Sequence, residues 1–375
     1  LWPLLLVVVL LGVLPFVTLL LSGVRETMES NAVDIDSRVV ENAAVTLDGA
    51  MVDQWSRVGD ESEYLDRALE DLLAREGASM QEFLGSRELQ QRYSQAVFGD
   101  LLEYLRQDSS CGVFLVLSSG APTSGASSHE GFFLRDSDPT TKTDTNSDLL
   151  VERGPKSLAH DSGITMDTAW APSFSFEAYG ERDCDDYFYE PYLAAIGHPN
   201  VDARSLGYWS SKPFVLEDDT ADNQEMLTYS LPLSVDGEVY GVLGIELSTS
   251  YLESSYFSVS ALDRDQNAGF ALAVRGEDGE YRDVCGTGLL YDVAAANGSF
   301  SLSSSGQESL WHVDGAHVGN QDVYALVSDV KLYGSRVPYE GTDWAVVGFV
   351  PASSVFGLGN QVYQTIIFVI LACAL

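Results

Sequence analysis

The chain has 375 residues, and its 20 Lys and Arg against 56 Asp and Glu give a formal net charge of −36. A surface this acidic repels phosphate backbones, which excludes nucleic acid as an expected partner. It favours a cationic, zwitterionic or neutral ligand. It also argues against a cytoplasmic location, because loops on that side of membrane spans carry excess Lys and Arg. The length suffices for two domains.

Two apolar segments bracket the chain. Residues 1–24 read LWPLLLVVVLLGVLPFVTLLLSGV, and the last residues read QTIIFVILACAL. A bilayer span takes about 20 apolar residues, so we predict a transmembrane helix at 1–24 and the truncated start of a second at 363–375. A signal peptide is the alternative at the N-terminus, but its apolar region would be only about 7–15 residues long. We therefore expect a two-pass piece of a longer cell-membrane protein, with residues 25–362 extracytoplasmic.

Residues 25–108 are predicted to form a long helical stalk. One apolar stripe recurs at spacings of three and four: Val40, Ala44, Leu47, Met51, Trp55 and Val58. Gly59-Asp60 interrupts it. A second stripe follows, ending near Gly77: Tyr64, Leu65, Ala68, Leu69 and Leu72. A further helical piece is expected at 79–106. The first stripe predicts a parallel homodimer through residues 30–58, and packing against a sheet would explain it equally well.

After residue 108, the spacing of apolar residues changes from the period of a helix to a pattern typical of β-strands. Two α+β modules are predicted, a membrane-distal one at 109–257 and a membrane-proximal one at 258–362, each with an antiparallel sheet. The distal strands are expected at 112–117, 131–135, 226–235 and 238–247, and the proximal ones at 269–275, 324–332 and 342–350. Asp236-Gly237 between two β-rich runs is a strong hairpin signal. Residues 136–168 are polar and turn-rich, 170–177 are extended, and 185–196 form a helix.

This order of parts resembles the double Cache family of extracytoplasmic bacterial sensors, over most of residues 25–362. The most specific stretch runs from Leu227 to Leu252, with TYSLPLSVDGEVYGVLGIELSTSYL as its core. The ending GTDWAVVGFVPASSVF is similar to the closing strand of the family's proximal module. The resemblance implies two PAS-like modules, a ligand pocket in the distal one, and a cytoplasmic output. Among outputs we favour a diguanylate cyclase or histidine kinase over a chemoreceptor.

The family's amino-acid-binding members use an Arg-x-Trp-Tyr stretch, a Tyr-x-Asp after a Pro, and an Asp that closes the last strand. Here Tyr208-Trp209 lacks the Arg two residues before Trp, and Pro213 is followed by Phe214 and Leu216. The final acid is Glu246. These departures disfavour an α-amino acid as the ligand.

A ligand pocket needs a few convergent polar groups on an apolar lining. The candidate ligand-binding residues are Tyr208, Trp209, Lys212, Phe214, Thr228, Ser230 and Glu246. Strand alternation puts Thr228 and Ser230 on one face, Trp209 could stack on a ligand, and Lys212 or Glu246 could pair with its charge. Alternatively, Trp209 and Phe214 belong to the core and Lys212 is solvated.

Other groups of residues give weaker evidence for a binding site. Asp144-x-Asn146-x-Asp148 matches the start of a calcium loop, but Leu149 and Pro155 occupy positions that exclude an EF-hand. A metal at His312, Asp314 and His317 is conceivable, although Asp314-Gly315 is an ordinary turn dipeptide. We predict no metal and no cofactor. Three cysteines lie outside the second span, Cys111, Cys184 and Cys285, and a Cys111–Cys184 disulfide is possible.

No nucleophile stands near a plausible base in any known motif, so catalysis by the visible chain is not expected. Two rival interpretations remain open. One is an envelope binding or adhesion domain without a signalling output. The other is an envelope hydrolase, which turnover by the purified protein would support.

Overall fold

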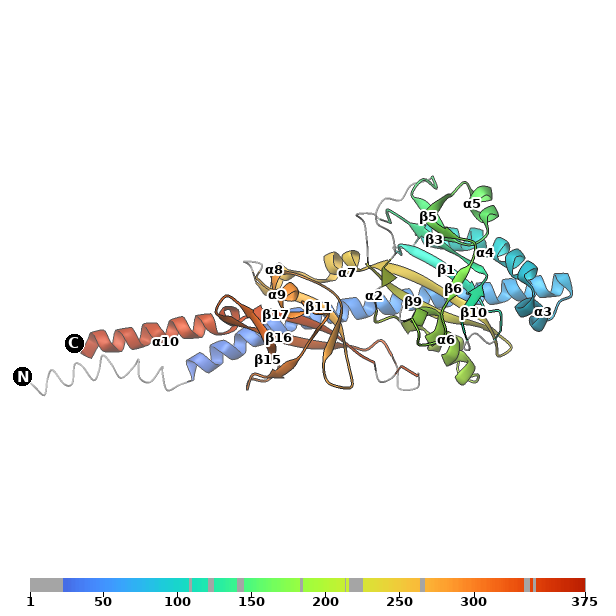
Figure 1. Cartoon of the computed structure of the whole chain (residues 1–375). Helices are drawn as coiled ribbons and strands as arrows, with labels where there is room; N and C mark the ends of the chain where they lie inside the picture. The colour runs from blue at the N-terminus through green and yellow to red at the C-terminus, as the bar shows by residue number, and fades with distance from the viewer. Residues whose placement is uncertain are drawn as a thin grey trace, which may run out of the picture. The chain divides into compact units, whose positions relative to one another are not determined.

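The computed structural model describes residues 23–107, 110–120, 125–139, 145–182, 185–212, 214–215, 225–263, 267–333, 338–339 and 342–374. It confirms a mixed α+β fold with a long N-terminal helix and antiparallel sheets (Figure 1). The chain divides into two compact units. Unit 1 comprises Leu1–Asp48, Ser255–Lys331 and Thr342–Leu375, and unit 2 comprises Gly49–Ser254 and Leu332–Gly341. Residues of the expected stalk at 25–108 are thus shared between the units.

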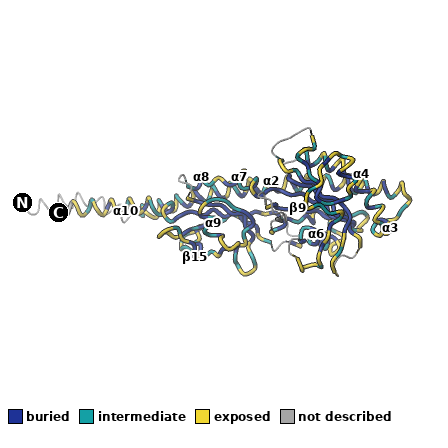
Figure 2. Tube along the Cα trace, turned by 45° about the horizontal axis from the view of Figure 1, so that its top comes forward, coloured by how far each residue is buried: buried dark blue, intermediate teal, exposed yellow. Residues whose placement is uncertain are grey.

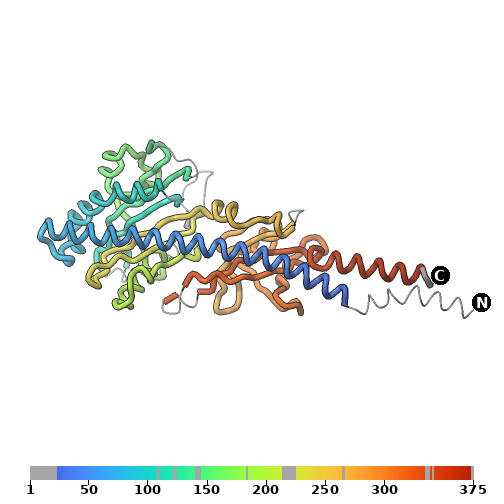
Figure 3. The backbone as a smooth tube through the Cα atoms, turned by 180° about the vertical axis from the view of Figure 1, so that it is seen from behind, coloured from blue at the N-terminus to red at the C-terminus, as the bar shows by residue number. Residues whose placement is uncertain are grey.

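Helix α2 (Val24–Glu76) runs for 53 residues without a break, as the tube in Figure 3 shows. The interruption expected at Gly59-Asp60 is therefore wrong. A single helical Gly costs only about 1 kcal/mol, and the apolar stripe continues past it, since Val58 and Leu65 are both buried. The helix ends at Glu76, and the next residue, Gly77, has a φ of +64°, the left-handed conformation that glycine adopts without strain.

Two further helices follow, α3 (Met80–Gly85) and α4 (Arg87–Gln107). Ser79 starts α3 with a capping box, because its hydroxyl accepts from the Glu82 N–H and the Glu82 carboxylate accepts from the Ser79 N–H. Tyr64, expected in the buried stripe, is instead exposed and donates from its hydroxyl to Asp100 at 2.6 Å.

Unit 2 is built on a sheet with strand order β5-β4-β3-β1-β10-β9-β7, in which β8 also pairs with β9. Its strands are β1 (Gly112–Leu117), β3 (Gly131–Asp136), β4 (Leu149–Arg153), β5 (Thr165–Ala171), β7 (Tyr208–Trp209), β8 (Phe214–Val215), β9 (Glu225–Val235) and β10 (Glu238–Ser248). A separate pair joins β2 (Ser127–His129) to β6 (Phe174–Phe176). The β9–β10 hairpin is confirmed, with positive φ at Asp236 and Gly237.

The segment 136–168, expected to be only polar and turn-rich, contains β4, helix α5 (Lys156–Ser162) and the start of β5. The pairing of β4 with β5 is parallel, unlike the rest of the sheet. Strand β5 is largely exposed, so its sequence lacks the apolar alternation by which a half-buried strand is recognised.

The unit 2 sheet is covered on two faces. Helix α4 packs on one face, where Phe98 meets Phe132 with ring centroids 5.0 Å apart. Helix α6 (Asp186–Gly197) packs on the other, where Phe188 joins the aromatic cluster around Phe114 and Phe133. Buried residues consequently concentrate along the strands (Figure 2). A short 3-10 turn, η2 (Ala203–Leu206), leads into β7.

Unit 1 has its own sheet with strand order β13-β12-β11-β17-β16-β15-β14. Its strands are β11 (Gly269–Arg275), β12 (Tyr281–Thr287), β13 (Ser299–Phe300), β14 (Leu302–Ser304), β15 (Trp311–Val318), β16 (Gln321–Val330) and β17 (Asp343–Pro351). Helix α7 (Thr249–Tyr256) spans the unit boundary, and α8 (Val259–Leu262), α9 (Leu289–Ala294) and α10 (Ala352–Ala374) follow. The three predicted proximal strands correspond to β11, β16 and β17.

Within the described residues, α10 is the one helix long and apolar enough to cross a membrane, over Ala352–Ala372. The predicted second span therefore lies in a helix that begins earlier than expected. The first predicted span falls almost entirely on residues 1–22, which lie outside the described residues. Two flanking transmembrane helices thus stay a prediction.

Two glycines of unit 2 give a matched test of this packing. A Cβ on Gly244 in β10 would lie 2.1 Å from the Phe114 ring, whereas one on Gly49 in α2 would meet nothing within 4 Å. We expect Gly244→Ala to lower the free energy of unfolding by about 1–3 kcal/mol, and Gly49→Ala to raise it by up to about 1 kcal/mol. Urea denaturation of the chain in detergent measures both. Equal stability of Gly244→Ala and the wild type would contradict the placement of Phe114.

Candidate ligand-binding site

One row of residues crosses the centre of the unit 2 sheet. Arg135 on β3 pairs with Gly112 on β1, Gly112 pairs with Glu246 on β10, and Glu246 pairs with Thr228 on β9. Directly paired residues of adjacent strands point to the same face of a sheet. Two charged side chains and a hydroxyl are therefore brought together on the face that α6 covers.

Gly112 makes room for this arrangement. A Cβ at this position would lie 2.8 Å from the Phe133 ring and 3.2 Å from Oε2 of Glu246. Since real Cβ contacts are not this short, any larger residue would displace one of these groups. The glycine lets the Glu246 carboxylate lie across the middle of the row, toward Arg135.

A small cavity of about 40 Å³, partly open to solvent, lies above this row. Its lining combines aromatic and charged residues: Phe114, Phe133, Glu152, Arg153, Phe174, Tyr187, Thr228 and Glu246. The aromatic rings contact one another edge to face, with centroids 5.8 Å apart for Phe114–Phe133 and 5.0 Å for Phe114–Tyr187. Apolar walls with a few polar groups are typical of small-molecule sites.

The charged groups form a buried cluster. Nη1 of Arg135 lies 2.8 Å from Oε1 of Glu152, and its Nη2 lies 3.5 Å from Oε2 of Glu246. The side chains of Arg135, Glu152 and Glu246 are only 10%, 2% and 3% exposed. The contact with Glu246 is the longer of the two ion pairs, and Arg135 Nη2 and Glu246 Oε2 have no hydrogen-bond partner of normal geometry among the described residues.

Burial, against the opposing positive charge of Arg135 and with a smaller contribution from the negative charge of Glu152, raises the pKa of Glu246 to about 7. Removal from water disfavours a charged carboxylate. The carboxyl group of Glu246 therefore exchanges its proton near neutral pH. That behaviour is common at functional sites.

The structure places the predicted ligand-binding residues at different positions around the sheet. Thr228 and Glu246 line the cavity. Ser230 lies on the same face, one row away, paired with Tyr208. Its buried hydroxyl has no hydrogen-bond partner among the described residues. Tyr208 packs on Tyr339, with ring centroids 5.1 Å apart.

Trp209 points to the opposite face of the sheet. It packs on Tyr229 with ring centroids 4.8 Å apart, and its backbone N–H donates to the Tyr333 hydroxyl at 2.8 Å. Lys212 is half-exposed and lies 3.6 Å from a carboxylate oxygen of Asp186. Phe214 is part of β8, and its side chain lies outside the described residues. Ligand contact by these three residues stays a prediction.

Several cavity residues were absent from the sequence-based set. These are Phe114, Phe133, Glu152, Arg153, Phe174 and Tyr187, together with Arg135 beside them. The run Gly131-Phe-Phe-Leu-Arg135 carried a usable signal, because an arginine within an otherwise apolar strand needs a buried partner. Glu152 lies in a segment where no strand was expected.

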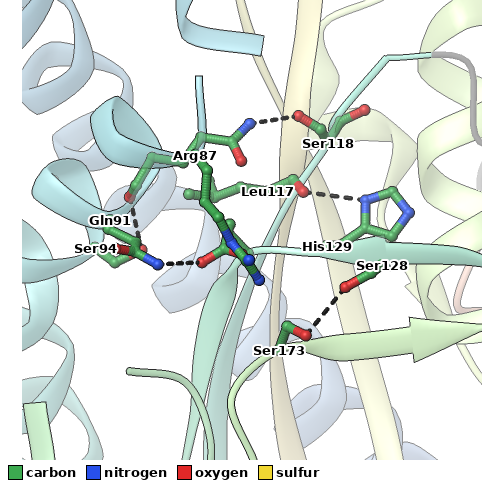
Figure 4. A network of polar contacts seen from close by, with 10 residues as sticks. Arg87, Gln91, Ser94, Leu117, Ser118, Ser128, His129 and Ser173 are labelled. Atoms are coloured by element: carbon green, nitrogen blue, oxygen red, sulfur yellow. Dashed lines mark hydrogen bonds and ion pairs between the residues drawn. The ribbon is translucent and has the colours of Figure 1, made fainter. Parts of the chain in front are cut away.

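His129 is a second buried titratable group, and Figure 4 shows its surroundings. One ring nitrogen lies 3.1 Å from the Leu117 carbonyl and the other 2.8 Å from the Ser127 hydroxyl. Burial lowers its pKa, so the ring stays neutral. Nearby, Glu130 accepts from Arg87 and from Gln91. These contacts tie α4 and β2 to the sheet and leave His129 no nitrogen for other chemistry.

The other predicted constellations do not form sites in the described part of the chain. No group of three or more His, Cys, Asp or Glu there is arranged to hold a metal ion. His317 lies 3.0 Å from Asp322, and Asn146 donates to the Ser162 carbonyl. Cys111 is a buried thiol without a disulfide, and Cys184 lies outside the described residues, so the possible pairing of the two is not observed.

No protein-family model and no curated protein matches the chain. Among solved structures it is similar to the periplasmic sensory domain of the Campylobacter jejuni chemoreceptor Tlp1 (13% identity, TM-score 0.45, covering 88% of this chain and 98% of that one). It is also similar to the ligand-binding domain of the Pseudomonas fluorescens chemoreceptor CtaA, solved with L-isoleucine (11%, 0.41, 89% and 98%).

A third similar structure is the extracellular domain of soHK1S-Z6, which is described as a histidine kinase (14% identity, TM-score 0.39, 88% and 98% coverage). These structures are sensory domains of membrane receptors, the class that the sequence resemblance predicted. At such identities and TM-scores they assign no ligand and no residue role to this chain.

The pKa of Glu246 makes stability depend on pH. Its pKa is higher in the folded chain than the usual 4.5, so the folded state binds more protons between about pH 4.5 and 7. The free energy of unfolding therefore falls as pH rises through that window. We expect Glu246→Gln to remove a fall on the order of 3 kcal/mol between pH 4.5 and 8.

Chemical denaturation at several pH values measures this slope. Glu238→Gln, an exposed change on the same strand, is the matched control and should keep the wild-type slope. Asp66, whose pKa burial raises to about 7, contributes a slope of the same sign that remains in both variants. Identical slopes for Glu246→Gln and the wild type would show that Glu246 titrates normally.

Proposed function

We propose that this chain is the extracytoplasmic ligand-sensing part of a transmembrane signal-transduction receptor, and that a small molecule binds in the unit 2 cavity. The observation that carries the proposal is the cavity itself, whose aromatic lining surrounds buried charged groups. Oε2 of Glu246 and Nη2 of Arg135 lack hydrogen-bond partners among the described residues. Such groups are costly in a protein interior, and a bound ligand would satisfy them.

Binding would act on the receptor by shifting populations. A ligand shifts a conformational equilibrium only by its difference in affinity for the two states. The cavity residues come from β1, β3, β4, β6, β9, β10 and α6. A ligand that contacts all these elements favours the arrangement in which they surround it. That arrangement is the signalling state of unit 2 in our proposal.

The proposed membrane topology of the chain has two transmembrane spans. Helix α10 supplies an apolar stretch of membrane-spanning length at Ala352–Ala372. The apolar segment at residues 1–24 is the proposed first span, which leaves the acidic chain between them outside the cytoplasm. We propose a cytoplasmic output of the diguanylate cyclase or histidine kinase type, on the basis of the sequence resemblance.

A homodimer through the N-terminal helix completes the proposal. The stripe of Val40, Ala44 and Leu47, from which we predicted it, is buried within the chain itself. The same helix exposes Ile35 and Val45, which are 62% and 65% accessible to solvent. Burial of these two side chains against a second copy is favoured by the hydrophobic effect.

A thermal-shift screen tests the proposed function. The panel contains amines, amino acids, carboxylates, purines and sugars, added to the chain in detergent. A ligand at one hundred times its dissociation constant stabilises the folded state by about 2.7 kcal/mol. We expect one class of compound to raise the melting temperature of the wild type, and Thr228→Val or Glu246→Gln to abolish the effect.

Thr165→Val is the matched control, since Thr165 is an exposed residue on β5, at the edge of the same sheet. It should respond to the ligand as the wild type does. Stabilisation that survives in both cavity variants would place the ligand elsewhere and refute the site. Absence of any stabilising compound would remove the support for a small-molecule sensor.

A further inference from the structure

A short chain of hydrogen-bonding groups lies inside unit 2, on the face of the sheet that α4 covers. The Tyr240 hydroxyl on β10 lies 2.9 Å from Oδ1 of Asp66 on α2 and 3.2 Å from the Tyr93 hydroxyl on α4. The Tyr93 hydroxyl in turn lies 2.8 Å from the Leu65 carbonyl oxygen. Three contacts therefore connect four oxygen atoms and join α2 to α4 and β10.

A β-bulge places Tyr240 in this chain. The register of β9 against β10 shifts at Tyr240, which is left without a partner on β9. Strand alternation alone would put it on the face of Glu246 and the cavity. The bulge instead turns its ring toward α3 and α4, where it packs on Phe83 and Tyr93 with ring centroids 6.3 and 6.0 Å apart. Bulges re-aim side chains in this way, often beside functional sites.

The number of protons available for the three contacts depends on Asp66. A tyrosine hydroxyl donates one hydrogen bond, a carbonyl or carboxylate donates none, and a protonated carboxyl group donates one. With Asp66 ionised, the two tyrosines supply two protons for three contacts. If they donate to Asp66 and to Leu65, the two hydroxyl oxygens face each other without a proton between them. A proton on Asp66 completes the set, because each group then donates to the next, from Asp66 through both tyrosines to the Leu65 carbonyl.

Burial makes the missing proton costly. Tyr93 and Tyr240 are both 0% exposed, and a hydrogen bond left unmade between buried polar groups is strongly unfavourable. Asp66 is only half-buried. Its carboxyl group can therefore exchange a proton with solvent, while the hydroxyl groups behind it depend on that proton for a complete chain.

The charges around Asp66 act in the same direction. Burial is the largest cause that raises its pKa, to about 7, and the negative charges of Glu70 on α2 and Asp202 before η2 add to the shift. The hydrogen bond from β10 opposes it. Arg204, the cation of η2, forms an ion pair with Glu63. A proton is thus the group that restores neutrality at Asp66.

We propose that Asp66 is a proton-binding site through which this chain responds to pH, in addition to the small molecule of the cavity. The protonated state holds α2 against α4 and β10 through the complete hydrogen-bond chain. As pH rises through about 7, the proton leaves and one of the three contacts is lost. Helix α2 contributes residues to both units, so its attachment at Asp66 is a suitable point of control.

Infrared difference spectroscopy on the full chain in detergent measures the proton on Asp66. A protonated carboxyl group has a C=O stretch that the carboxylate lacks, and the band lost in Asp66→Asn belongs to Asp66. Glu246 also titrates near neutral pH, so the spectra are recorded in the Glu246→Gln background. We expect the Asp66 band to disappear with a midpoint near pH 7.

Tyr93→Phe tests the hydrogen-bond chain itself. Tyr93 acts on Asp66 only through Tyr240. Without the Tyr93 hydroxyl, a protonated Asp66 would leave the Tyr240 proton without an acceptor, whereas an ionised Asp66 accepts it. The pKa of Asp66 should therefore fall by about one unit or more. Tyr192→Phe is the matched control, since it removes another buried hydroxyl, which contacts Ser118, and it should leave this pKa unchanged.

Hydrogen exchange of α2 measures the conformational response. After correction for the intrinsic effect of pH, amides around Asp66 should exchange severalfold faster at about pH 8 than at about pH 6. Asp66→Asn should abolish this difference, because its amide group donates to Tyr240 at every pH. Asp71→Asn, an exposed change on the same helix, should retain it.

Three outcomes would overturn the proton site: an Asp66 band with the midpoint of an ordinary aspartate, an Asp66 pKa that Tyr93→Phe leaves unchanged, or hydrogen exchange without the pH difference. The thermal-shift screen tests the cavity separately. A compound that stabilises the chain while Asp66 titrates normally would leave the proposed sensor without a pH response. A pH response without any stabilising compound would leave the proton as the supported signal.

Discussion

The buried ion pair between Arg135 and Glu152 is the interaction on which the candidate site depends. It joins β3 to β4 on the face of the sheet that α6 covers, with both side chains almost completely removed from water. A single buried charge at either position would be severely unfavourable, whereas the pair is tolerated. The same guanidinium group also lies 3.5 Å from Glu246, so one buried arginine faces two buried carboxylates beside the cavity. The chemistry of the site follows from that asymmetry.

Two glycines are as important to the site as its charged residues. Gly112 and Gly244 lie on adjacent strands of one face, and a Cβ at either would collide with a cavity residue. The rings of Phe133 and Phe114 occupy the space that these Cβ atoms would take, and both rings line the cavity. A sheet face of larger residues would fill this space and become ordinary core. The absence of side chains in the middle of the sheet therefore keeps the cavity open.

The sequence predicted the elements whose signals are local, and it missed the pairing that assembles the site. The Asp236-Gly237 turn, the β1 run and the long helix each carry their signal within a few residues. The row from Arg135 to Thr228 joins strands that are distant in the sequence, and its register is invisible without the fold. Trp209 shows the same limit, since a one-residue step along β7 moves it to the opposite face from Tyr208.

A buried carboxylate with an incomplete counter-charge lowers the stability of the folded chain, but it also gives the cavity a group that interacts with a ligand. An apolar residue of similar size in place of Glu246 would remove the cost of burying its charge, and it would also remove a polar group that can distinguish one ligand from another. A tenfold difference in affinity between two conformations corresponds to about 1.4 kcal/mol. The interaction of one buried carboxylate with one cation is of this size or larger. In the function proposed above, contact of a ligand with a single group such as Glu246, held between β1 and β9, is therefore sufficient to bias unit 2 between two states.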